Sequence, residues 1–322
     1  MAESWRAKPV RIGAIDVGSN GIRLAIGEVD TNGAVSHINS FREAVRLGTD
    51  AFAPGGMLGE KIISDTVAAF DKFKKLMDEH EVARHRAVAT SATRESSNGD
   101  ELVARIAEKT SINLETIGPL EEAQLVFLGV AGVVDVTHKT ALMIDMGGGS
   151  IEVTVTRDRL ALGCESLRIG PVRLMQKLVD QGLTEADGPQ IIERYRGAVK
   201  ELIRAELEDN PPDLCVGTGG NIVRMGKLRT QLLGKTKAYK VKPGDLDSMI
   251  DKLLEMPVED RIKKLSLRPD RADVIALATM ALRLMIADLP INRVLIPGVG
   301  LKEGLLRYVA HHPHGSSTTP AL

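Results

Sequence analysis

Two stretches of the sequence decide the fold, VRIGAIDVGSNGIRLAIGEV at residues 10–29 and TALMIDMGGGSIEVTVT at residues 140–156. Each is an apolar run that ends in an aspartate, Asp16 or Asp145, followed by a glycine-rich turn and a second apolar run. This pattern predicts two β-hairpins. The copies lie about 130 residues apart, which favours duplicated domains over a solenoid, whose repeats are about 20–50 residues long.

Strand-like and helical patterns alternate along the rest of the chain. Apolar residues recur at helical spacing in seven segments: 60–80, 100–110, 121–131, 186–209, 244–256, 271–288 and 302–312. Strands are predicted at 87–89 and 213–216, and 293–300 is predicted to be a strand followed by a glycine turn. The sequence therefore predicts an α/β protein with two lobes.

Length and composition limit the class of protein. The 322 residues fit two domains of about 150 residues each, and 43% hydrophobic with 26% charged residues is typical of globular chains. A net charge of −1 and only 3% aromatic residues argue against a nucleic-acid binder. Two cysteines and no apolar run long enough to cross a bilayer predict a cytoplasmic protein without disulfides, zinc clusters or a membrane partner.

Three glycine-rich turns follow predicted strands, at 16–21 (DVGSNG), 145–150 (DMGGGS) and 217–221 (GTGGN). Glycine lets backbone N–H groups approach an anion closely. A tight hairpin would explain one such turn, but three favour phosphate binding between the two lobes. None matches the P-loop or the dinucleotide-binding glycine pattern.

Carboxylates accompany these turns. Asp16 and Asp145 stand at the ends of predicted strands, and Glu152 lies two residues beyond the second turn. Hard oxygen ligands of this kind suit Mg²⁺, with Mn²⁺ as an alternative. Turn capping or a surface location is the competing interpretation of each.

For other charged residues the sequence allows either a role in a binding site or an ordinary surface location. Glu121 and Glu122 begin a predicted helix, where acidic residues are common, and the sequence does not say which of them is special. Arg23 and Arg94 are candidate phosphate ligands. Seven basic residues without an intervening acid form either a polyanion track or a solvated face: Arg224, Lys227, Arg229, Lys235, Lys237, Lys240 and Lys242.

At these residues the chain resembles the exopolyphosphatase/guanosine pentaphosphate phosphohydrolase (Ppx/GppA) family, within the acetate kinase–sugar kinase–Hsp70–actin superfamily. The matching blocks occur in order over nearly the whole chain: Asp16–Arg23, REAVRLG (42–48), Thr90–Arg94, EEAQLVFLGV (121–130), DMGGGSIE (145–152), GTGG (217–220), RADVI (271–275) and LKEGLL (301–306). The long C-terminal helical domains of some relatives are missing, so the chain is similar to the short, two-domain form.

The resemblance implies a two-lobe, actin-like ATPase (ribonuclease H-like) fold with duplicated mixed-sheet domains around an interdomain cleft. The N-terminal lobe would comprise 1–135 plus 302–312, and the C-terminal lobe 136–301. The segment 313–322 is small, polar and contains proline, so it is predicted to be a disordered tail. Chain crossings near 132–139 and near 300 would act as hinges, and the protein could form a homodimer.

The resemblance also implies residue roles. Glu122 would be the general base that activates water, Asp145 and Glu152 would lie near Mg²⁺ with Asp16, and Arg23 and Arg94 would hold the terminal phosphoryl group. The remaining expected phosphate-binding residues come from the three turns: Gly18, Ser19, Asn20, Gly147, Gly148, Gly149, Ser150, Gly217, Thr218, Gly219 and Gly220.

The implied activity is Mg²⁺-dependent release of terminal orthophosphate from inorganic polyphosphate, guanosine pentaphosphate (pppGpp) or both. The alternatives are a small-molecule kinase of the superfamily and a non-catalytic polyphosphate or alarmone sensor. Four places depart from the family pattern. Gly21 replaces a usual Ser, Ile151 a usual Thr, and Asn221 a small hydroxyl residue, and Pro119-Leu120 precedes the two glutamates where relatives tend to have polar residues or Gly.

Overall fold

The computed structural model describes residues 9–158, 160–208 and 210–312. The chain divides into two compact units. Unit 1 contains the chain up to Ala51, Gly55–Gly129 and the segment that begins at Leu301, and unit 2 contains Phe52–Pro54 and Val130–Gly300. The tail predicted to be disordered, 313–322, lies outside the described residues.

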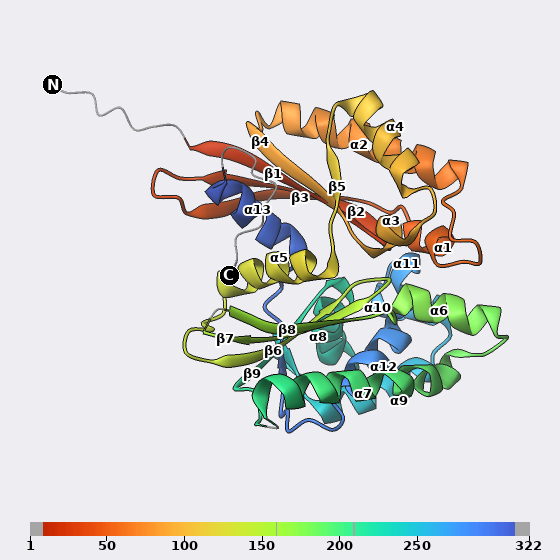
Figure 1. The fold of residues 1–322 in the computed structure, drawn as a ribbon. Helices are drawn as coiled ribbons and strands as arrows, with labels where there is room; N and C mark the ends of the chain where they lie inside the picture. Colours follow the sequence, from red (N-terminus) through yellow and green to blue (C-terminus); the bar gives the residue numbers. More distant parts are fainter. Residues whose placement is uncertain (1–8, 159, 209, 313–322) are drawn as a thin grey trace. The chain divides into compact units, whose positions relative to one another are not determined.

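Unit 1 is built on a five-stranded mixed sheet with the order β3-β2-β1-β4-β5 (Figure 1). Its strands are β1 (Val10–Gly18), β2 (Gly21–Val29), β3 (Val35–Glu43), β4 (Arg84–Ala89) and β5 (Leu114–Thr116). The first three form an antiparallel meander, and β4 and β5 run parallel to β1. The predicted first hairpin is therefore the antiparallel half of this sheet.

Helices cover both faces of the first sheet. Helices α2 (Glu60–Glu79) and α4 (Gly99–Thr110) lie on one face, and α5 (Pro119–Ala131) and α13 (Leu301–His311) on the other (Figure 1). The stripe Ile63, Phe70, Phe73 and Met77 is buried on α2, as the helical spacing predicts. Short helices α1 (Leu47–Ala51) and α3 (Ser91–Glu95) lie in the loops that follow β3 and β4.

The C-terminal helix α13 joins unit 1 at β1 and β2. Its contact with α5 requires Gly304, because a Cβ atom at this position would lie 1.6 Å from the carbonyl oxygen of Leu125. Helix α13 thus packs against α5, the helix whose first turn contains Glu121 and Glu122.

Unit 2 repeats this architecture. Its six-stranded sheet has the order β10-β11-β9-β6-β7-β8, with β6–β8 antiparallel and with β9 and β11 parallel to β6. Its strands are β6 (Thr140–Met146), β7 (Ile151–Arg157), β8 (Leu160–Leu167), β9 (Leu214–Thr218), β10 (Lys240–Val241) and β11 (Val294–Leu295). The succession β8-β7-β6-β9-β11 matches β3-β2-β1-β4-β5, so the duplication predicted from the two hairpins extends to five strands.

The helices of unit 2 surround α12 (Ile275–Met285), whose residues 275–282 are all buried. This helix contacts α6, α7, α8 and α9. The other helices are α6 (Pro171–Asp180), α7 (Gly188–Leu207), α8 (Gly220–Leu233), α9 (Pro243–Leu254), α10 (Val258–Leu265), α11 (Pro269–Ala272) and the short 3₁₀ helix Glu185–Asp187. None of the helices in the described part of the chain combines the length and apolarity needed to cross a bilayer.

Some predicted boundaries are wrong. The helix predicted at 271–288 is two helices, since α11 ends at Ala272 and α12 begins at Ile275. The strand and glycine turn predicted at 293–300 are β11 followed by a loop that contains Pro297, Gly298 and Gly300. Strand β3 was not predicted, since it is an edge strand with mostly exposed polar residues and lacks the apolar alternation of a half-buried strand.

Candidate phosphate and metal site

The first hairpin places three charged residues in one row across unit 1. Asp16 on β1 is the register partner of Arg23 on β2, and Arg23 is the register partner of Arg42 on β3. Arg23 Nη1 donates a hydrogen bond to Asp16 Oδ2 over 2.9 Å, and the Asp16 side chain is only 7% exposed. The carboxylate expected to be a metal ligand is therefore bound by an arginine, and the row carries one more positive than negative group.

The equivalent row of unit 2 has the opposite charge. Asp145 on β6 is the register partner of Glu152 on β7, which is the partner of Ser166 on β8. Thr218 Oγ1 donates to Asp145 Oδ1, and Ser166 Oγ donates to Glu152 Oε1 over 2.9 Å. Glu152 is 1% exposed. Like charges facing each other across a strand pair are destabilising, so this arrangement of oxygen donors fits a bound divalent cation.

The turn of the first hairpin is fixed through its carbonyl groups. The carbonyl oxygen of Ser19 accepts a hydrogen bond from the N–H of Gly48 over 2.9 Å, and that of Asn20 accepts one from Arg42 Nη2 over 2.6 Å. In a trans peptide the N–H points away from the carbonyl of the same peptide unit. The N–H of Asn20 is therefore directed away from Gly48, as an anion-binding turn requires.

The turn of the second hairpin is fixed in the same way by α6. The N–H of Val172 donates to the carbonyl oxygen of Gly148 over 2.9 Å, and Arg173 Nε donates to that of Gly149 over 2.7 Å. The N–H groups of Gly149 and Ser150 consequently point away from α6. Arg173 holds the second turn as Arg42 holds the first.

The third glycine turn, 217–221, connects β9 to α8. Thr218 pairs with Asp145 in the parallel β6–β9 register, and its side chain is completely buried. Gly219 has a φ of +92°, and a Cβ atom there would lie 2.3 Å from the carbonyl oxygen of Met146. Only glycine allows the turn to pass this close to the end of β6.

The loop after β4 occupies the place in unit 1 that the third turn occupies in unit 2. Asp16 pairs with Val88 on β4, as Asp145 pairs with Thr218 on β9. The segment Thr90–Arg94 therefore follows β4 as 217–221 follows β9. Ser91 Oγ and Ser19 Oγ lie 3.0 Å apart, which links this loop to the first turn.

Glu121 and Glu122 have different surroundings within unit 1. Arg86 on β4 donates to Glu121 Oε1 over 2.7 Å and to Glu115 Oε2 over 2.7 Å, and its guanidinium lies 4.6 Å from the ring centroid of Tyr308. Burial lowers the pKa of Arg86, but the hydrogen bonds to Glu115 and Glu121 outweigh it and leave this pKa raised. Glu121 is thus part of a structural ion-pair network.

Glu122 is buried, with 5% of its surface exposed, and its Oε2 lies 3.5 Å from Arg94 Nη1. Arg94 Nη1 also donates to the carbonyl oxygen of Ile117 over 2.6 Å, immediately before α5. A guanidinium has five N–H donors, so Arg94 retains donors for a phosphoryl group. Within unit 1 the structure brings together a buried carboxylate and one of the two arginines predicted to bind phosphate.

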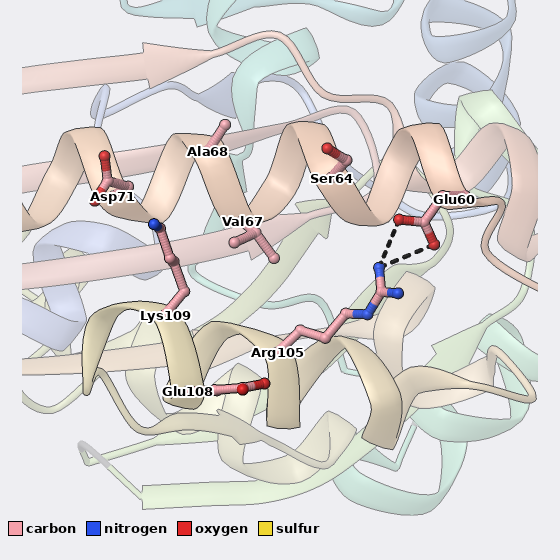
Figure 2. Close-up of a pocket in the computed structure, with 8 residues that line it drawn as sticks. All are labelled: Glu60, Ser64, Val67, Ala68, Asp71, Arg105, Glu108 and Lys109. Atoms are coloured by element: carbon pink, nitrogen blue, oxygen red, sulfur yellow. Dashed lines mark hydrogen bonds and ion pairs between the residues drawn. The ribbon is translucent and has the colours of Figure 1, made fainter.

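A pocket of about 580 Å³ lies elsewhere in unit 1, between α2 and α4 (Figure 2). Its wall consists of Glu60, Ser64, Val67, Ala68, Asp71, Arg105, Glu108 and Lys109. Arg105 crosses from α4 to Glu60 on α2 with a hydrogen bond of 2.7 Å (Figure 2). None of the predicted site residues belongs to this pocket.

Comparisons with known proteins agree with this arrangement. Residues 26–312 match the Ppx/GppA phosphatase family. The chain is 30% identical over 282 residues to exopolyphosphatase 2 of Mycobacterium tuberculosis, a match that covers 82% of this chain and 86% of the relative. The chain belongs to the Ppx/GppA phosphatase family.

Solved structures from this family share the fold. A crystal structure of an exopolyphosphatase from Cytophaga hutchinsonii has a TM-score of 0.82 at 25% identity and covers 94% of this chain and 98% of its own. The Aquifex aeolicus Ppx/GppA family member has a TM-score of 0.76 at 26% identity and covers 96% of this chain and all of its own. The α/β fold with two duplicated mixed sheets, which the family resemblance implies, is confirmed.

The structure also identifies residues that the sequence did not. Arg42 is the first residue of the segment 42–48 that resembles the family, but no role is predicted for it. Arg173 lies on α6, a helix that the sequence pattern did not predict. Ser166 contacts Glu152 from β8, a strand that was also not predicted. No local sequence motif marks these residues. Arg42 and Ser166 are placed by the pairing register of their strands, and Arg173 by its position in the first turn of α6.

Proposed function

We propose that this Ppx/GppA family member is a phosphoanhydride hydrolase that releases orthophosphate from the ends of inorganic polyphosphate, and that pppGpp is a second substrate. The observation that carries the proposal is the pairing of buried Glu122 with Arg94 beside the loop that follows β4. Hydrolysis of a terminal phosphoryl group needs a positioned water and groups that stabilise the developing negative charge. A buried carboxylate beside an arginine offers both.

Each side chain would have a defined task. Glu122 would accept a proton from the attacking water, while Arg23 and Arg94 would donate hydrogen bonds to oxygens of the terminal phosphoryl group. The backbone N–H groups of the three glycine turns would bind the phosphate oxygens. Asp16 would orient Arg23, because its carboxylate already accepts a hydrogen bond from this arginine.

The second hairpin would hold the metal. Asp145 and Glu152 are both carboxylates, they are register partners, and both are at least nine-tenths buried, which fits Mg²⁺ or Mn²⁺. A bound divalent cation would supply charge neutralisation for the phosphate oxygens. Thr218 and Ser166 would orient the two carboxylates through the hydrogen bonds that they donate.

The direct test measures orthophosphate released from polyphosphates of several lengths, from pppGpp and from ATP, with and without Mg²⁺. We expect Mg²⁺-dependent release from polyphosphate and from pppGpp, and no activity in excess chelator. Transfer of phosphate from ATP to a small acceptor would instead identify a kinase. Tight binding without release would identify a sensor.

A matched pair of variants tests the choice of base. Glu122→Gln should lower the rate of release about 10²–10⁴-fold while substrate affinity changes only a few-fold, because an amide cannot accept the proton. Glu121→Gln changes the same group one residue earlier and should retain most of the activity. An inactive Glu121→Gln beside an active Glu122→Gln would contradict the assignment.

A further inference from the structure

The basic run between residues 224 and 242 separates into two classes in the structure. Its two arginines are engaged within unit 2: Arg229 is buried and donates to Asp245 Oδ2 over 2.5 Å, and Arg224 donates to the carbonyl oxygen of Leu265. Burial lowers the pKa of Arg224. The arginines therefore stabilise the fold and are not available as a binding surface.

The five lysines of the run differ from these arginines. Lys227, Lys235, Lys237 and Lys242 are exposed, and Lys240 is partly exposed. Within the described residues no carboxylate lies within 4.0 Å of any of the five ammonium groups. This part of unit 2 thus presents positive charge that the protein itself does not neutralise.

The lysines of α2 provide the contrast. Four of them form ion pairs with nitrogen–oxygen distances between 2.5 and 2.8 Å: Lys61 with Asp65, Lys72 with Glu43, Lys74 with Asp78 and Lys75 with Asp71. A solvated helix face of this chain therefore carries lysines and acids together. The lysines after α8 depart from that pattern.

The chain carries these lysines on two adjacent legs, the segment 235–239 beside α8 and the strand β10 that follows it. After α8 ends, the segment 235–239 returns beside the same helix: Arg229 Nη1 donates to the carbonyl oxygen of Lys237 over 2.9 Å. Gly226 is needed for the close approach, since a Cβ atom there would lie 2.0 Å from the carbonyl oxygen of Ala238. The N–H of Ile296 then donates to the carbonyl oxygen of Tyr239 over 2.7 Å, and β10 begins.

This return leads toward the third glycine turn. Strand β11 runs parallel to β9 with Leu295 opposite Val216, so Ile296 and Tyr239 lie at the edge of the sheet where β9 enters the turn 217–221. Gly226 is six residues after the first residue of α8, a rise of about 9 Å along the helix axis. Residues 235–239 therefore run from the far end of α8 back toward the proposed phosphate turn. Strand β10 then leads away from the turn, so Lys240 lies nearer to it than Lys242.

We infer that Lys235, Lys237, Lys240 and Lys242, the basic return segment, bind the internal phosphates of a long inorganic polyphosphate chain. The inference rests on the proposed function, in which the glycine turns hold the terminal phosphates. Lysine suits this task because its ammonium is a hydrated point charge without the fixed bidentate geometry of arginine, so a chain that shortens at its end can shift along the segment. Tyr239 is the one aromatic residue in the segment, which disfavours recognition of stacked nucleobases.

The test compares two variants of equal charge change. In the first, Lys235, Lys237, Lys240 and Lys242 are all changed to Gln; in the control, Lys61, Lys72, Lys74 and Lys75 on α2 are changed to Gln. Binding of fluorescently labelled long-chain polyphosphate is measured by anisotropy in excess chelator at several salt concentrations. Tripolyphosphate and a single-stranded DNA oligomer of similar charge serve as the short and the nucleic-acid probes.

We expect the first variant to bind long polyphosphate about 10–100-fold more weakly at low salt. The slope of the logarithm of the binding constant against the logarithm of the salt concentration should become shallower by about 0.7 for each lysine removed, as for counterion release from single-stranded polyanions. The control should stay within about threefold of wild type, and tripolyphosphate affinity should not change. Equal loss in both variants, equal loss for tripolyphosphate, or DNA binding as tight as that of polyphosphate would overturn the inference. Phosphate release by the wild type is assayed separately, so a protein that binds long chains through these lysines without hydrolysing them would refute only the proposed function.

Discussion

The two hairpins occupy equivalent places in their sheets, yet their central rows carry different charges. In unit 1 the row consists of Asp16, Arg23 and Arg42, and in unit 2 the equivalent positions hold Asp145, Glu152 and Ser166. The backbone duplication has preserved the register, including the aspartate that ends the first strand. The residue opposite that aspartate is an arginine, Arg23, in unit 1 and a glutamate, Glu152, in unit 2.

This difference separates two kinds of ligand. Two guanidinium groups beside one carboxylate favour phosphate oxygens, whereas two carboxylates that face each other favour a divalent cation. The turns that follow Asp16 and Asp145 are nevertheless held in the same way, because Arg42 and Arg173 each donate a hydrogen bond to a carbonyl oxygen of one turn. Under the proposed function, both duplicated turns would bind anions, and the cross-strand partner of the aspartate, Arg23 or Glu152, would decide which turn is accompanied by a metal.

The largest loss of activity is expected when the arginine of the first row, Arg23, is neutralised. Arg23→Gln should lower kcat/KM for polyphosphate about 10²–10³-fold, as is typical when a donor to a charged transition state is lost. The control is Arg11→Gln, because Arg11 lies on β1 at the far end of the same hairpin and pairs with surface groups. Similar kinetics for the two variants would show that Arg23 does not contact the phosphoryl group.

A smaller effect is expected when one acid of the second row is neutralised. Glu152→Gln should raise the Mg²⁺ concentration that gives half-maximal activity about 10–100-fold, because it removes a charged oxygen ligand. Ser166→Ala should raise it only a few-fold, since it removes one hydrogen bond to Glu152. Glu165→Gln, at the exposed neighbouring position on β8, should leave it unchanged. An unchanged Mg²⁺ requirement in Glu152→Gln would contradict the metal assignment.

The shared construction of the turns predicts a still smaller effect. Arg173→Ala should raise the KM for substrate about tenfold with a smaller change in kcat, because one charge-assisted hydrogen bond that orients the turn is lost. Arg173→Lys can still donate to Gly149 and should recover part of the affinity. If alanine and lysine at this position behave alike, the hydrogen bond does not position the turn.

The smallest effect on activity is expected at Gly21, which stands where the family pattern has a serine. Gly21 has a φ of +147°, and a Cβ atom would lie 2.8 Å from Arg42 Nη2. Gly21→Ser should therefore lower the free energy of unfolding by about 1–3 kcal/mol. In an Arg42→Ala background the same substitution should cost less, since the guanidinium is gone. Equal changes of melting temperature in both backgrounds would show that Arg42 does not account for this glycine.

Much of the fold follows from the sequence, because hairpins and amphipathic helices depend on local pattern. Both hairpins lie where they were predicted, and the helix expected at 60–80 is α2. Strand β8 and helix α6 are not among the predicted elements. The apolar residues of β8, an edge strand, do not alternate regularly, so its local signal is weak and tertiary packing decides it. Helix α6 does carry a local signal, since Pro171 begins it and Val172, Leu174 and Leu178 form a buried stripe at helical spacing.

Local sequence pattern does not predict the division of labour within the site, which only the family resemblance implied. Glu121 and Glu122 are equivalent in a helical first turn, and they are distinguished by Arg86, which lies 35 residues before Glu121. Asp16 and Asp145 stand in nearly identical motifs, and only strand register shows that one faces Arg23 and the other Glu152. Sequence motifs point to the residues at each turn, whereas the structure shows which side chains from neighbouring strands they face.

Binding of Mn²⁺, followed by electron paramagnetic resonance in the absence of substrate, tests the difference between the two rows most directly. Wild-type protein is compared with Asp16→Asn in the first row and Glu152→Gln in the second. The account predicts that Glu152→Gln weakens Mn²⁺ binding at least about tenfold, while Asp16→Asn leaves it within about twofold because Asp16 serves Arg23. Loss of Mn²⁺ binding in Asp16→Asn together with normal binding in Glu152→Gln would contradict it.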